Sequence, residues 1–205
     1  MRPWLVAILL AACKNGSGSA TIANLHVDPC YQKSVKDAAV FDLQPDYFVA
    51  DMVYASTDDA HPQNRLTIRV QTSGHRIDEA DGLYLSAADS SMIANQLVQQ
   101  IGPTSNLRGT LMLNATCPDH PVTMELDGTV TFHKFGSASG SGASQDFKIV
   151  YGDELSADFD LKITDRRVTT LGGVASVPTD AQVSGELTGN FDFTVQPGRG
   201  AQAYP

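Results

Sequence analysis

Tryptophan is almost missing from this chain, and basic residues are few. The one tryptophan is Trp4. The 14 lysines and arginines are outnumbered by 23 aspartates and glutamates, which gives a formal net charge of -9. Such a surface repels the phosphates of nucleic acid, so we expect no nucleic-acid partner.

Long hydrophobic runs are also missing. The most apolar stretch reaches from Trp4 to Ala12 and carries no charge. It is too short to cross a hydrocarbon core of ~30 Å as a helix, which needs about 20 residues. Its length and its position behind Arg2 are typical of the hydrophobic region of a signal peptide instead.

A short motif follows this stretch directly, with the sequence Leu10-Ala11-Ala12-Cys13. An aliphatic residue, two small residues and a cysteine in this order resemble the lipobox of bacterial prolipoproteins. In that family the cysteine sulfur receives a diacylglyceryl group and the leader is then removed. The resemblance therefore implies a signal peptide over residues 1–12 and a membrane anchor on Cys13. An ordinary leader or a short buried helix is the alternative.

The residues after Cys13 bear on location and domain organisation. Lys14 stands where lipoproteins of the inner membrane in enteric bacteria tend to carry aspartate, so the resemblance implies an outer-membrane lipoprotein of the bacterial cell envelope, on either face of that membrane. The run Lys14-Asn15-Gly16-Ser17-Gly18-Ser19-Ala20 has the composition of a flexible tether. We therefore predict a lipidated tether over residues 13–21 and a single β-rich domain over residues 22–205.

Cysteines are scarce as well, with three in the chain. If Cys13 carries lipid, Cys30 and Cys117 remain. An exported protein meets an oxidising compartment, so we expect these two to form a disulfide, which would stabilise the fold by about 4 kcal/mol. Two separate buried thiols are the alternative.

Most of the chain after Phe48 shows an apolar period of two. Leu107, Leu111 and Leu113 share one face of a segment, while Arg108 and Thr110 take the other. This alternation is typical of half-buried antiparallel strands. It returns in residues 65–71, 122–132, 147–151, 155–163 and 187–195. The sequence thus predicts a mainly β fold, an antiparallel β-sandwich or a small β-barrel.

One short helix is expected in addition. Asp89 provides a capping side chain, and Met92, Ile93, Leu97 and Ile101 fall on one side of a helix. Gly102-Pro103 would stop it.

Recognisable catalytic motifs are missing. The chain contains no His-Glu-x-x-His, no Gly-x-Ser-x-Gly and no Walker-type glycine loop. Asp119-His120 lies in an expected turn, where His120 would need partners assembled by the fold before it could act as a base.

Two acidic loops offer oxygen ligands for a hard cation such as Ca²⁺. The candidate ligands are Asp58, Asp59, Asp78, Glu79 and Asp81. Neither loop has the alternating ligands and distant glutamate of a calcium loop, so we favour solvated turns and predict no metal and no other cofactor.

These observations predict a lipid-anchored envelope lipoprotein without enzymatic activity. Its partners would be the membrane, through the lipid on Cys13, and other envelope proteins or glycans. An envelope hydrolase with a site around His120, or a carrier of a small apolar ligand, are the alternatives.

Overall fold

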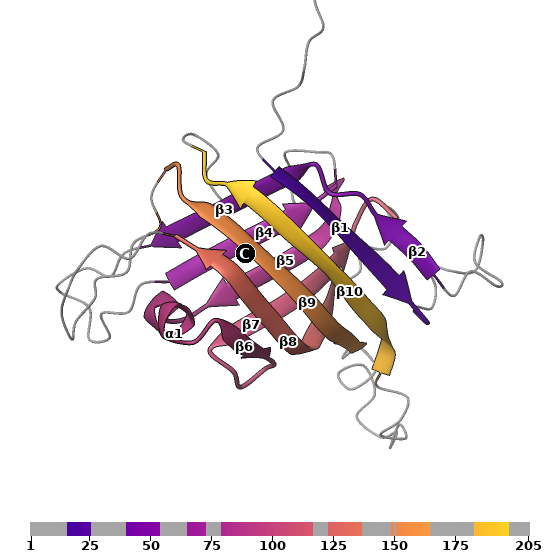
Figure 1. Ribbon diagram of the computed structural model, residues 1–205. Helices are drawn as coiled ribbons and strands as arrows, with labels where there is room; N and C mark the ends of the chain where they lie inside the picture. Colours follow the sequence, from indigo (N-terminus) through magenta and orange to yellow (C-terminus); the bar gives the residue numbers. More distant parts are fainter. Residues whose placement is uncertain are drawn as a thin grey trace, which may run out of the picture.

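The computed structural model describes residues 16–25, 40–53, 65–72, 79–116, 123–136, 149, 151–164 and 183–196. This part of the chain is mainly β (Figure 1). Its elements are β1 Gly16–Ala23, β2 Val40–Leu43, β3 Tyr47–Val53, β4 Arg65–Gln71, β5 Asp81–Ala87, α1 Ser90–Asn95, β6 Val98–Ile101, β7 Leu107–Leu113, β8 Thr123–Phe135, β9 Glu154–Thr164 and β10 Val183–Thr194. No helix among the described residues has the length and apolar character needed to span a membrane.

All ten strands belong to one sheet, in the order β2-β1-β10-β9-β8-β6-β7-β5-β4-β3. Neighbouring strands are antiparallel, except that β6 and β7 meet in a parallel pairing at Ile101 and Leu107. Strand β8 holds the two parts of the sheet together, because it pairs first with β7 and then with β6. Gly128, with φ of 143°, stands where β8 changes partner, a backbone conformation that other residues rarely adopt.

The sheet curls until its two parts face each other across an apolar core (Figure 1). Strands β3 and β10 are far apart in the strand order, yet the ring of Phe48 stacks 5.7 Å from the ring of Phe193. Ring contacts continue from Phe193 through Phe191 and Phe132 to Phe135. The result is a curled half-barrel whose inward side chains fill the space between its two parts.

The predicted mainly β fold is confirmed, and the alternation identifies the faces of β7 correctly. Leu107, Leu111 and Leu113 are at most 1% exposed and point inward. Arg108 is exposed and Thr110 is half-buried on the outer face. Burying one such leucine favours folding by about 1.5–3 kcal/mol, which is why a strand with this pattern settles with one dry face.

The predicted flexible tether is wrong for the residues from Gly16 onward, because they form β1. This strand pairs along its whole length with β10. A Cβ on Gly18 would lie 2.8 Å from the carbonyl oxygen of Asn190 and 3.1 Å from Cε1 of Phe48, and one on Gly16 would collide with Phe193. The glycines therefore leave room for the aromatic rings that pack against β1. Their structural role is hidden in the sequence, because a run of glycine and serine has the composition of a linker.

The expected helix is wrong in its extent. Helix α1 ends at Asn95, and Val98–Ile101 form β6, paired with β8. The side-chain amide of Gln99 donates hydrogen bonds to the carbonyl oxygens of Met92 and Gln96. The Met92 carbonyl also accepts the backbone N–H of Gln96, so the glutamine side chain adds to the hydrogen bonds that close the helix at its early end.

Gly18 provides a test of whether this segment is strand or tether. Gly18→Val should lower the free energy of unfolding by about 1–3 kcal/mol, because the added side chain meets backbone and a core ring. Ser17→Val is the matched control, since Ser17 is exposed on the outer face, and it should change stability by less than about 0.5 kcal/mol. Chemical denaturation measures both, and two neutral substitutions would contradict the strand.

Candidate functional site: a groove on the outer face

A groove of about 370 Å³ lies on the outer face of β5, β7 and β8. This volume is within the range of small-molecule sites, about 300–1,000 Å³. Side chains from all three strands line it, together with Gly102 and Pro103 of the β6–β7 connection. The lining residues that carry polar or soft groups are Tyr84, Ser86, Arg108, Thr110, Met112 and Glu125.

Register places these side chains in rows across the strands. Tyr84 lies opposite Thr110, and Thr110 lies opposite Glu125. Arg108 lies opposite Ser86 in the next row. Diagonal neighbours on one sheet face are about 7–8 Å apart, so a guanidinium and a carboxylate flank the same hollow from β7 and β8. The groove thus combines an aromatic ring, hydroxyl groups and charges of both signs.

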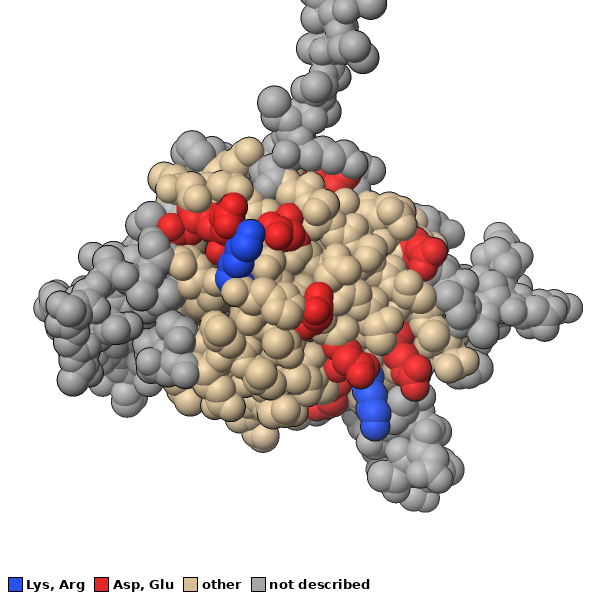
Figure 2. All heavy atoms as spheres, in the orientation of Figure 1, with Lys and Arg blue, Asp and Glu red and all other residues tan. Residues whose placement is uncertain are grey.

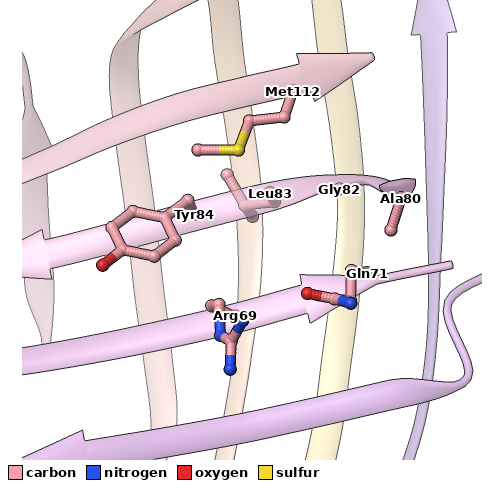
Figure 3. A pocket seen from close by; sticks show the side chains of 7 residues that line it. All are labelled: Arg69, Gln71, Ala80, Gly82, Leu83, Tyr84 and Met112. Carbon is pink, nitrogen blue, oxygen red and sulfur yellow. The ribbon is translucent and has the colours of Figure 1, made fainter. Parts of the chain in front are cut away.

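A small cavity adjoins the groove and shares Tyr84 and Met112 with it. Figure 3 shows Arg69, Tyr84 and Met112 side by side on β4, β5 and β7. The free space is about 10 Å³, close to what a single water molecule needs.

Arg69 forms the deep wall of this cavity. Its side chain is 2% exposed although it lies on the outer face of β4, opposite Tyr84. The guanidinium carbon is 5.8 Å from the centre of the Tyr47 ring, a cation–π distance. The buried guanidinium brings positive charge and several N–H donors to this end of the site.

The outer face of β8, β9 and β10 differs sharply from the groove, because it is acidic. Figure 2 shows acidic side chains spread over this face with few basic ones among them. The acidic residues are Glu125, Asp127, Glu154, Asp158, Asp160, Glu186 and Asp192, and the lysines are Lys134 and Lys162. Lys162 lies directly between Asp127 of β8 and Glu186 of β10.

An irregularity in β8 places two consecutive side chains on this acidic face. The register with β9 shifts between Phe132 and Lys134, so His133 and Lys134 both point outward. His133 Nε2 lies 2.8 Å from an Asp158 carboxylate oxygen, and Lys134 Nζ lies 2.9 Å from a Glu154 oxygen.

Exposure limits what this pair of contacts can do. The hydrogen bond with Glu154, joined by the charge of Asp192, raises the pKa of Lys134. His133 and Asp158 are 51% and 64% exposed, so water screens their attraction. A histidine that is hydrogen-bonded to a carboxylate acts as a catalytic base only if a nucleophile lies beside it. The hydrogen bond of the His133 ring is to Asp158, which does not supply such a nucleophile.

Most residues singled out from the sequence lie outside the described ranges. These are Cys13, Cys30, Asp58, Asp59, Asp78, Cys117 and His120. The disulfide between Cys30 and Cys117 and the site around His120 therefore stay predictions.

Of the candidate metal ligands, Glu79 and Asp81 are described, and Asp81 has a structural role. It is 5% exposed, and one carboxylate oxygen accepts hydrogen bonds from the backbone N–H groups of Ala115 and Thr116, at 2.8 and 3.0 Å. The other oxygen accepts the Thr116 hydroxyl at 2.5 Å. This carboxylate ties the start of β5 to the turn after β7. In the described ranges no three His, Cys, Asp or Glu side chains gather closely enough to hold a metal ion.

The groove was not foreseen from the sequence. The clearest sign of the groove in the sequence is Met112. This apolar residue takes an outward position on a strand whose other outward residues are polar. Tyr84, opposite Thr110, takes an outward position on β5. Neither residue indicates a site until pairing brings both beside Arg108 and Glu125.

Comparison with known proteins adds no relative. A scan of protein-family models and searches of the curated proteins and of the solved structures give no match to this chain.

Asp81 tests whether this carboxylate supports the fold. Asp81→Asn should lower the free energy of unfolding by about 1–3 kcal/mol, because one of the two accepting oxygens becomes an NH₂ group and the remaining hydrogen bonds lose a charged acceptor. Asp160→Asn, the same change at an exposed position of the acidic face, should have an effect below about 0.5 kcal/mol. The unfolding midpoint should stay the same with Ca²⁺ or with a chelator, and a midpoint that falls on chelation would identify a metal ligand instead.

Proposed function

We propose that this chain is a lipid-anchored lipoprotein of the bacterial cell envelope, where it binds an envelope protein or glycan without catalysing a reaction. The lipobox-like segment Leu10-Ala11-Ala12-Cys13 supports the anchor, and the outer groove supports the binding role. The alternatives of a hydrolase around His120 and of an apolar-ligand carrier have no described feature in their favour.

The composition of the groove carries the binding role. Tyr84 offers a flat face, Thr110 and Ser86 offer hydroxyl groups, and Arg108 and Glu125 offer charges of opposite sign. Such a set suits hydrogen bonding and stacking with a hydroxylated or peptide-like partner. The described lining residues contain no histidine, lysine or cysteine that would activate a nucleophile or serve as one.

The packed interior favours binding on the outside over binding within. The ring of Phe48 reaches Phe193, and Phe191 and Phe132 extend the contact, so aromatic side chains occupy the space that an internal ligand would need. We also infer a small open barrel rather than a sandwich of separate sheets, because all ten strands belong to one hydrogen-bonded sheet.

A charge reversal tests the groove. The purified full chain is immobilised and exposed to detergent-solubilised envelope proteins and to soluble fragments of cell-wall glycan, and the retained species are quantified by mass spectrometry. Arg108→Glu should reduce retention at least about tenfold, because a charged group at an interface centre contributes 1.4 kcal/mol or more. Lys162→Glu makes the same change on the acidic face, outside the groove, and should retain its partner. Equal retention by both variants and the unchanged chain would contradict the groove as the binding site.

The anchor has a separate test. Cells that express the chain are fed a fatty-acid analogue that can be tagged, and the protein is recovered from membranes. The unchanged chain should carry the tag and Cys13→Ala should not, because only a thiol forms the thioether to the lipid. A mature protein that keeps residues 1–12 and a free Cys13 thiol, measured by intact mass, would overturn the anchor.

A further inference from the structure

The linker between the proposed anchor and the sheet is very short. Only Lys14 and Asn15 separate Cys13 from Gly16, the first residue of β1. Fully extended, this stretch places Gly16 no more than about 11 Å from the Cα of Cys13. If the cysteine carries lipid in a bilayer, as the proposed function requires, the start of β1 lies close to the headgroups.

The start of β1 lies at one end of the sheet, beside the ends of three other strands. Gly16 pairs with Phe193, Phe193 with Leu155, and Leu155 with Phe135. We call this line across β1, β10, β9 and β8 the anchor end. Figure 1 shows that β1 and β9 begin here and that β8 and β10 finish here.

The turn before β9 extends the anchor end. The N–H of Gly152 donates to the carbonyl of Val195, and the N–H of Val195 donates to the carbonyl of Asp153, both at 2.9 Å. These bonds hold Tyr151 next to the end of β10, where it is 68% exposed. An exposed tyrosine suits the headgroup region, where its ring meets apolar groups and its hydroxyl meets water.

Strand β8 is shared by the groove and the anchor end, and the groove residue Glu125 lies at the other end of this strand from Phe135. Glu125, near the start of β8, pairs with Thr164 at the end of β9, whereas Phe135 pairs with Leu155 near its start. At 3.2–3.4 Å per residue, the stretch of β8 from Glu125 to Phe135 measures roughly 30 Å. Glu125, on the β8 side of the groove, is therefore about the length of this strand away from the anchor end.

The geometry points to an orientation in which the anchor end rests against lipid headgroups and the β8 side of the groove, at Glu125, lies away from the bilayer. This side of the groove then meets a partner in the aqueous space, roughly 30 Å from the anchor end, and not a lipid. The anchor end would touch the headgroups without attracting anionic lipid, because its lysine is already engaged. Lys134 is paired with Glu154 and lies 3.7 Å from an oxygen of Asp192.

Single-tryptophan variants test this orientation. Since Trp4 is the only tryptophan, the chain without residues 1–12 contains none, and one substitution introduces one reporter. The native lipidated protein is placed in phosphatidylcholine vesicles with a nitroxide on a fraction of the headgroups. Tyr151→Trp should lose at least about half of its fluorescence, because Gly16 is held within about 11 Å of Cys13 and Tyr151 lies at the same end of the sheet. Glu125→Trp, on the β8 side of the groove and roughly 30 Å along that strand from Phe135, should lose none.

A second pair of variants guards against misfolding. Ser17→Trp and Glu186→Trp lie on exposed outward positions near the two ends of the paired strands β1 and β10. The first should be quenched and the second should not. Equal quenching at both ends, or stronger quenching at the groove end, would overturn the orientation.

Flotation of the unchanged chain with vesicles separates the two hypotheses. If Cys13→Ala abolishes vesicle binding but quenching is equal at both ends, the orientation is rejected and the lipid anchor is retained. An unchanged chain that does not float with vesicles rejects both.

Discussion

Ring contacts across the core hold the two parts of the sheet together. Phe48 on β3 stacks against Phe193 on β10, and the contact passes through Phe191 and Phe132 to β8. Strands that are distant in the sheet order are thereby brought face to face, and the sheet must curl. Because aromatic side chains bury more apolar area than any other residues, this chain of rings is the natural centre of the fold. The glycines of β1 complete it, since the backbone approaches the rings only where no side chain intervenes.

The curl gives the outer surface two different characters. Over β8, β9 and β10 the outward side chains are acidic and well solvated, and their ion pairs contribute little to stability. Over β5, β7 and the start of β8 the outward side chains line a groove with an aromatic ring, a thioether and charges of both signs. Strand β8 contributes to both regions, and it also runs from the groove to the end where β1 begins. One strand thus joins the groove to the end of the sheet where β1 begins.

Several polar residues that attract attention in the sequence support the fold instead. Asp81 is an example, because its carboxylate accepts hydrogen bonds from two backbone N–H groups and one hydroxyl of the turn after β7. Acidic residues in turns can accept hydrogen bonds from backbone donors or bind cations, and sequence spacing does not distinguish these roles. The Gly-Ser run before Ala20 was misinterpreted for a related reason. Its composition indicates a flexible backbone, whereas its strand structure depends on the rings of Phe48 and Phe193 that it faces.

The sequence by itself determined several of the strands and the faces of those strands. Alternation along β4, β7, β9 and β10 is a local property, because successive side chains of a strand point to opposite sides and only one side is dry. Tertiary structure alone decided which strands pair, where Val98–Ile101 leave the helix to join β8, and which outward residues meet. Tyr84, Arg108 and Glu125 lie on three separate strands, and their proximity depends on register between those strands. Register follows from complementary packing of residues far apart in the chain, which periodicity within one segment does not encode.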